Sequence, residues 1–105
     1  MIDKIRSFSN LKFGWDGYKA ISPSPTAIAT AICLYRTLDI KPDRIAPSVV
    51  GGIGFSFKDI YIEMYNDGQI YSVFRYDGED SIISEETDMK ELNKKINDYS
   101  RRKTS

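Results

Sequence analysis

Residues 60–76 read IYIEMYNDGQIYSVFRY, and this stretch decides the fold. Two runs of alternating aromatic and β-branched residues flank the sequence Asn66-Asp67-Gly68. Alternation on both sides of such a short glycine-containing turn is typical of a β-hairpin. Both faces of the two strands carry apolar or aromatic residues, so we expect helices to cover one face while tyrosines partly shield the other.

Further strands are predicted on either side of this hairpin. Upstream, Val49-Val50 predicts the start of the sheet, Gly51-Gly52 a turn, and the alternating residues 53–58 a second strand. Downstream, residues 81–84 predict a short strand at an edge. The sheet is therefore expected to be an antiparallel β-meander of three to five strands.

A helix of about residues 25–39 precedes the sheet. Ser24 is a favourable N-cap, Pro25 suits the first helical position, and apolar residues follow at helical spacing. Pro42 ends this pattern. A short amphipathic helix is also predicted within residues 1–12.

A second long helix, of about residues 87–101, is predicted after the sheet. Ser84 or Thr87 can cap it, and its acidic first turn and basic last turn are favoured by the helix dipole. Residues 102–105 are expected to fray. Together these elements predict an α+β fold of two layers, in which the meander packs against both helices within a single domain of residues 1–105.

Composition restricts the class of function. The chain contains no histidine, so the commonest general base and metal ligand is missing. Its one cysteine, Cys33, lies in an apolar run where a thiol packs as a small hydrophobe. We therefore expect no catalytic or metal-binding residues, no cofactor and no enzymatic activity. The single cysteine and the lack of a long apolar segment favour a soluble, cytoplasmic protein that does not bind membranes.

Zero net charge conceals a segregated distribution of charged residues. Acidic residues crowd positions 77–91, and basic residues follow in 92–105. Such a surface is a poor partner for nucleic acid and suits a basic protein surface better. The candidate binding residues of the acidic segment are Asp77, Glu79, Asp80, Glu85 and Glu86, and the alternative interpretation is that they are solvated turn residues.

The segment Gly14-Trp15-Asp16-Gly17-Tyr18 supplies the remaining candidate binding residues, Trp15, Asp16 and Tyr18. We expect mainly a structural role for them. Trp15 would close the core between helix and sheet, Asp16 would bond the following backbone amides, and Tyr18 would bury its ring. In the alternative interpretation, Trp15 and Tyr18 stay partly exposed as anchors for a partner.

Together with Ala20, Pro23 and Pro47, this segment resembles the opening motif of a loose group of small uncharacterised bacterial proteins. The resemblance spans residues 10–76 and implies a bacterial or prophage origin and a compact α+β fold, but it carries no established activity. The chain departs from the pattern of the group at residues 55–57, where an acidic residue and a tryptophan are expected.

Three functions remain open at this point. The first is a non-catalytic protein that binds another protein, as a small inhibitor or accessory factor of a bacterium, phage or prophage. The second is a small-ligand-binding module that stacks its ligand on Trp15, Tyr61, Tyr65 and Tyr71, and the third is a carboxylate-dependent enzyme. A homodimer, formed through an exposed strand edge or tyrosine face, is a further alternative.

Overall fold

The computed structural model describes residues 1–76, 79–84 and 88–104, with side chains described for 1–74 and 88–100. Its centre is one sheet of five strands, which neighbour one another in chain order and pair antiparallel throughout. The strands are β1 (Arg44–Pro47), β2 (Ile53–Ser56), β3 (Ile60–Met64), β4 (Ile70–Tyr76) and β5 (Glu79–Ser84). The predicted antiparallel meander is confirmed.

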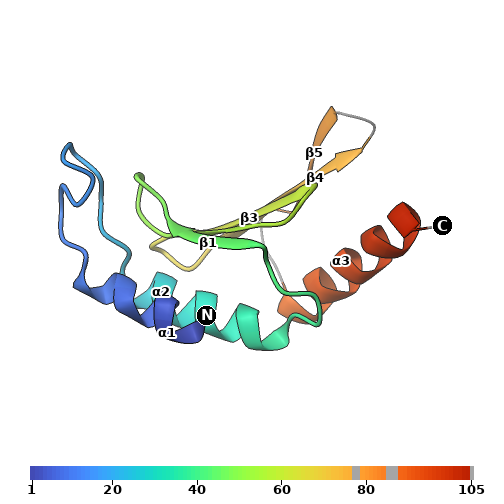
Figure 1. The fold of residues 1–105 in the computed structure, drawn as a ribbon, viewed down its shortest axis with the longest axis horizontal. Helices are drawn as coiled ribbons and strands as arrows, with labels where there is room; N and C mark the ends of the chain where they lie inside the picture. The colour runs from blue at the N-terminus through green and yellow to red at the C-terminus, as the bar shows by residue number, and fades with distance from the viewer. Residues whose placement is uncertain (77–78, 85–87, 105) are drawn as a thin grey trace.

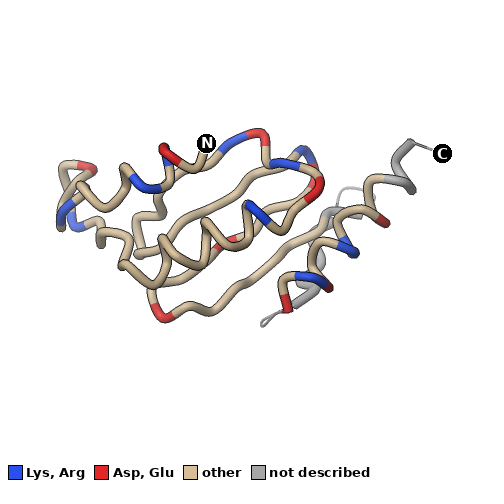
Figure 2. The backbone as a smooth tube through the Cα atoms, turned by 90° about the horizontal axis from the view of Figure 1, so that it is seen from below, with Lys and Arg blue, Asp and Glu red and all other residues tan. Residues whose placement is uncertain are grey.

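The helices lie on one face of this sheet (Figure 1). They are α1 (Ile2–Ser7), the 3₁₀ turn η1 (Phe8–Asn10), α2 (Pro25–Thr37) and α3 (Met89–Thr104). Seen from below in Figure 2, α1 and α2 run next to each other and α3 lies toward the other end of the sheet. In the described part of the chain no helix covers the opposite face, which we call the open face. The two-layer α+β fold is confirmed.

Helix α2 begins as the sequence predicts. The Ser24 hydroxyl oxygen accepts a 3.0 Å hydrogen bond from the backbone N–H of Ala27, and Pro25 occupies the first helical position. The buried face of the helix carries Ala27, Ala31 and Leu34. Two alanines on this face let the helix backbone approach the sheet closely. The side chain of Cys33 is exposed on this helix, so the expectation that it packs as a small hydrophobe is wrong.

Alternation in the strands sets the core. Ile60, Ile62 and Met64 are buried on the helix side, as are Ile70 and Phe74 of the paired strand. Helix α3 contributes Leu92, Ile96 and Tyr99 to the same core, and the rings of Phe74 and Tyr99 meet edge to face at 5.4 Å. The predicted hairpin is confirmed.

The start of the sheet differs from the prediction. Strand β1 is formed by Arg44–Pro47, and Val49 and Val50 lie in the following loop, 54% and 59% exposed. Gly51 and Gly52 have φ angles of 92° and 101°, which turn the chain back toward β2. A side chain at position 52 would also collide with the Met64 carbonyl oxygen. The two valines therefore belong to a loop that glycine makes tight, although β-branched residues favour strands.

The ends of α3 also differ from the prediction. The helix begins at Met89, and the carboxylate of Asp88 accepts a 2.9 Å hydrogen bond from the N–H of Lys90, as a cap does. Ser84 lies in β5, and Thr87 lies outside the described residues. The helix continues to Thr104, beyond its expected end and into the segment expected to fray. None of the helices in the described part of the chain is long and apolar enough to cross a membrane.

Asn66 fastens the N-terminal segment to the β3–β4 turn. Its side-chain oxygen accepts a 2.7 Å hydrogen bond from the N–H of Ser24, and its side-chain nitrogen donates to the carbonyl of Ser22 at 3.0 Å. The Ser24 hydroxyl in turn donates to the Asn66 carbonyl at 2.9 Å. These three bonds fix where the chain enters α2, and they bring the loop before α2 to one end of the sheet.

Candidate functional site

The aromatic loop, residues 12–21, is closed by its own hydrogen bonds. Asp16 Oδ1 accepts from the backbone N–H of Tyr18 at 2.8 Å and of Ala20 at 3.3 Å. The N–H of Gly14 donates to the Ala20 carbonyl at 2.8 Å, and Gly17 takes a φ of 88°. The predicted role of Asp16 is confirmed, and these hydrogen bonds hold the loop backbone.

The large side chains of this loop do not fill the core. Tyr18 is 84% exposed and Phe13 is 71% exposed, so the expectation that Tyr18 buries its ring is wrong. Trp15 is half-buried and lies outside the core cluster, so the expectation that it closes the core is also wrong. Trp15 and Tyr18 stay outside the core because Ile5 and Phe8, just upstream, already fill it from the N-terminal segment.

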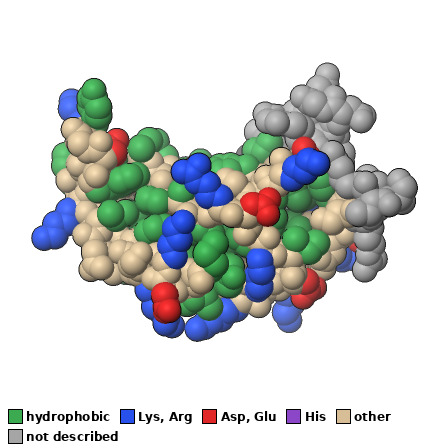
Figure 3. Space-filling model, in the orientation of Figure 1, with side chains coloured by type: hydrophobic (Ala, Val, Ile, Leu, Met, Phe, Trp, Pro, Cys, Tyr) green, Lys and Arg blue, Asp and Glu red, His purple; other side chains and the backbone are tan. Residues whose placement is uncertain are grey.

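A second loop lies beside the aromatic loop (Figure 1). The N–H of Ile21 donates a 2.9 Å hydrogen bond to the Val49 carbonyl, and Ile21 and Val50 form a parallel bridge. Ile21 is 47% exposed, and both valines are exposed too. We call this surface the apolar rim and define it by Phe13, Trp15, Tyr18, Ile21, Val49 and Val50. Figure 3 shows hydrophobic side chains gathered at this end of the molecule.

The open face of the sheet carries a cluster that we call the tyrosine face, formed by Tyr61, Glu63, Tyr65 and Tyr71. The Tyr61 hydroxyl donates to Glu63 Oε1 at 3.0 Å. The rings of Tyr65 and Tyr71 meet edge to face, with centroids 5.0 Å apart. Tyr61 lies across the neighbouring strand above Gly54, where any side chain would collide with its ring. The prediction that tyrosines partly shield this face is confirmed.

Glu63 contributes to the raised pKa values of Tyr61 and Tyr65. Its hydrogen bond to Tyr65, helped by partial desolvation, raises the pKa of Tyr65 to about 12. Burial raises the pKa of Tyr61 above its ordinary value, and the nearby Glu63 charge adds to this effect. Both hydroxyls are therefore protonated at neutral pH and can serve as hydrogen-bond donors to the carboxylate.

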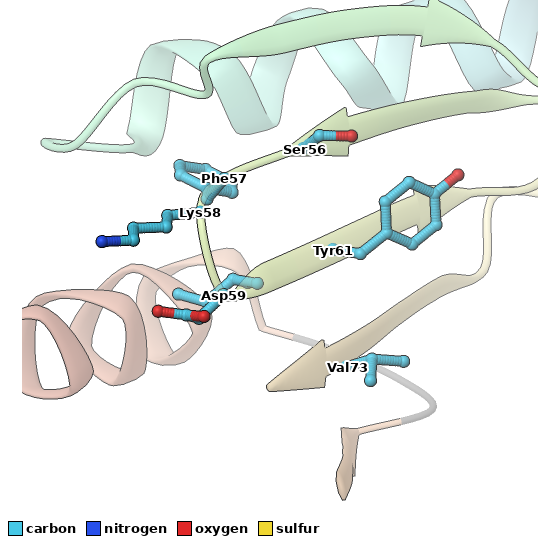
Figure 4. Close-up of a pocket in the computed structure, with 7 residues that line it drawn as sticks. Ser56, Phe57, Lys58, Asp59, Tyr61 and Val73 are labelled. Carbon is cyan, nitrogen blue, oxygen red and sulfur yellow. The ribbon is translucent and has the colours of Figure 1, made fainter. Parts of the chain in front are cut away.

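A small hollow lies at the β2–β3 turn (Figure 4). Its volume is about 260 Å³, which is below the range typical of small-molecule sites. Lys58 and Asp59 lie at the turn, whereas the hydroxyl of Tyr61 points away from them, toward Glu63. The polar groups around this hollow thus do not converge on one point.

The acidic candidates are only partly placed. Glu79 and Asp80 lie on β5, opposite Tyr76 and Arg75 in the backbone register. Asp77, Glu85 and Glu86 lie outside the described residues. In the described part of the chain, no group of three metal-ligating side chains is placed to hold a metal ion.

The structure brings the aromatic loop next to Val49 and Val50, which lie far from it in the sequence. Trp15 and Tyr18 share one loop with Phe13, and Ile21 joins them to Val49 and Val50. No role was predicted for Phe13 or Ile21, and the two valines were predicted to begin a strand. The available signal was Gly51-Gly52, since two successive glycines directly after two valines favour a loop as much as a strand start.

Comparisons with protein-family models, with curated proteins and with solved structures each find no match for this chain. The resemblance to bacterial proteins with a Trp-Asp-Gly opening motif therefore stays a prediction, and the function has to be inferred from the surface itself.

Proposed function

We propose that this protein binds another protein, and that the apolar rim is its main contact surface. The observation that carries this proposal is the exposure of Phe13 and Tyr18 on a loop whose backbone is fixed by hydrogen bonds. Tyrosine and tryptophan are enriched among the residues that dominate binding energy at protein interfaces. A preformed loop loses little conformational entropy on binding, which favours affinity.

Three features support a macromolecular partner. The exposed apolar side chains come from two adjacent loops, so they form a surface. Of the hollows in the described part of the chain, the one at the β2–β3 turn is small and the one beside Tyr65 and Tyr71 is shallow, whereas one of about 400 Å³ lies between the β2–β3 turn and Tyr99 of α3. Small-molecule sites usually enclose most of their ligand. A protein partner can cover such a surface without a deep pocket.

The wider role belongs to the same proposal. We infer a non-catalytic inhibitor or accessory factor of a bacterium or prophage that acts in the cytoplasm, on the basis of the missing histidine and the opening motif. The acidic segment, residues 77–91, would attract a partner with a basic surface over a distance. Binding should then weaken as salt concentration rises.

A small-ligand-binding module is the second candidate. The edge-to-face pair of Tyr65 and Tyr71 favours it, because one ring can stack on a planar ligand while the perpendicular ring contacts the edge of that ligand. Co-purification of a small molecule, and a rise in melting temperature when it is added back to the purified protein, would support this alternative.

The test of the main proposal is capture of a partner from host lysate, followed by mass spectrometry. The wild type and a Lys19→Ala control should capture one stoichiometric partner, because Lys19 is an exposed polar neighbour in the same loop. A Phe13→Ala, Tyr18→Ala double variant should lose this partner while keeping its melting temperature. Equal capture by the double variant and the control would overturn the proposal.

A further inference from the structure

Glu63 occupies a central position on the open face. It lies on the middle strand of the sheet, with Gly54 of β2 on one side and Tyr71 of β4 on the other. Its side chain is half-buried and accepts a hydrogen bond from Tyr61. Among the described side chains, no lysine or arginine lies within ion-pair distance of it, although Arg44 shares the open face on the edge strand β1.

Among the side chains that the structure describes, the half-buried carboxylate of Glu63 has no counter-charge. Removing a carboxylate from water costs free energy unless charge or hydrogen bonds compensate for it. The tyrosine hydroxyls supply hydrogen bonds but no positive charge. The site is thus complementary to a cation that arrives from outside.

The surroundings of Glu63 suit a cation that also stacks on aromatic rings. Tyr71 is its cross-strand neighbour, and Tyr65 packs against Tyr71. The shallow hollow beside these rings is completed by Asn66, Asp67 and Gln69, and no lysine or arginine lines it. Aromatic faces attract ammonium and guanidinium groups, and a carboxylate beside them adds a charge-assisted hydrogen bond.

We propose that Glu63, Tyr65 and Tyr71 receive a cationic side chain, arginine in the first instance, from the partner protein. The proposal rests on the proposed function, since it names the chemistry of the partner. Arginine fits better than lysine because its planar guanidinium can stack on a tyrosine ring while it bonds a carboxylate. The apolar rim would anchor the partner, and the tyrosine face would select for a basic residue on it.

The test is an NMR titration of the whole protein with three blocked pentapeptides, Gly-Ser-X-Ser-Gly, in which X is arginine, lysine or citrulline. Citrulline keeps the shape of arginine and lacks its charge. The arginine peptide should shift amide signals of residues 61–71, and the citrulline peptide should not. Comparable shifts from citrulline would overturn the proposal.

Glu63→Gln removes one negative charge from the open face. Its matched control, Glu91→Gln, removes one from an exposed position of helix α3. Glu63→Gln should weaken binding of the arginine peptide about tenfold, the loss expected for one charge-assisted hydrogen bond. Glu91→Gln should leave binding unchanged. Unchanged binding by Glu63→Gln would contradict the proposal, whereas lysine binding weaker than arginine binding would support it.

The two proposals fail in different ways. Tyr18→Ala should bind the arginine peptide as the wild type does, because Tyr18 lies on the aromatic loop and not on the tyrosine face. If rim variants lose the partner while the peptide never binds at Glu63, only the cation site is wrong. If the peptide binds at Glu63 and rim variants keep the partner, the rim is wrong as the main contact surface.

Discussion

The indole N–H of Trp15 donates a 3.2 Å hydrogen bond to the carbonyl oxygen of Ile21. Ile21 ends the same loop and also pairs with Val50, so the Trp15 bond braces the aromatic loop at the residue that joins it to the loop beside it. Trp15 therefore supports the apolar rim from its half-buried side, while Tyr18 and Phe13 project from it.

Trp15→Ala should lower the free energy of unfolding by about 1–2 kcal/mol, the worth of one hydrogen bond and partial burial. A fully buried tryptophan would cost about 3–5 kcal/mol. Urea unfolding should be followed by circular dichroism, because the variant lacks the only tryptophan of the chain. A loss of about 4 kcal/mol or more, which is the cost expected for a fully buried tryptophan, would show that Trp15 belongs to the core.

Gly52→Ala and Gly17→Ala form a matched pair. Both positions have positive φ, but a side chain at 52 meets the Met64 carbonyl, whereas one at 17 meets nothing nearby. Backbone strain alone should cost about 1–2 kcal/mol at Gly17, and the added collision should raise the cost at Gly52 to about 3 kcal/mol or more. Equal melting temperatures of the two variants would contradict this account of the β1–β2 loop.

Asp39 joins the end of α2 to α3. Its carboxylate accepts hydrogen bonds from the side-chain amides of Asn93 and Asn97, at 3.1 and 3.0 Å, and these bonds lower the pKa of Asp39 from its ordinary value. A lowered pKa stabilises the folded state above the ordinary pKa, and this stabilisation is lost as pH falls through the pKa of the folded state.

Asp39→Ala should therefore lower the melting temperature at neutral pH, and its difference from the wild type should shrink as the solution is acidified below the ordinary pKa of 3.8. Melting curves at a series of pH values measure this difference. The control is Asp43→Ala, which removes an exposed carboxylate from the loop before β1. A difference that stays constant down to strongly acidic pH would contradict the proposed bonds.

Tyr65 should titrate at about pH 12, because it donates a hydrogen bond to Glu63. Glu63→Gln should lower this pKa toward the ordinary value of 10.0, and Glu91→Gln should leave it unchanged. NMR of tyrosine labelled at the ring carbon that bears the hydroxyl resolves the single residue. Because the folded pKa is raised, its contribution to stability is complete below pH 10 and is lost as pH rises through 12. An unchanged pKa in Glu63→Gln would exclude Glu63 as the cause.

Most of the fold follows from local signals in the sequence. The hairpin of residues 60–76 has strong alternation and a glycine turn, and Ser24-Pro25 marks the start of a helix. Strand β1 was missed because its signal is weak: it is short, ends in Pro47 and buries Ile45 as its core residue. Val49 and Val50 gave a stronger local signal for a strand, but the positive φ angles of Gly51 and Gly52 place the two valines in a loop.

The candidate site was harder to predict because it depends on contacts between distant segments. Asn66 holds the entry to α2, and Ile21 pairs with Val50, although neither contact has a local sequence pattern. Trp15 and Tyr18 were predicted as candidate binding residues, but their place outside the core depends on Ile5 and Phe8 filling it. Tertiary packing of this kind cannot be read from spacing along the chain.

The most direct test of the central claim is the dissociation constant of the captured partner, measured by calorimetry for the wild type, Tyr18→Ala and Lys19→Ala. An interface anchor that contributes about 2 kcal/mol predicts a roughly 30-fold weaker dissociation constant for Tyr18→Ala. Lys19→Ala should bind within about twofold of the wild type, as an energetically neutral neighbour of an anchor does. If folded Tyr18→Ala binds as tightly as Lys19→Ala, the apolar rim is not the contact surface.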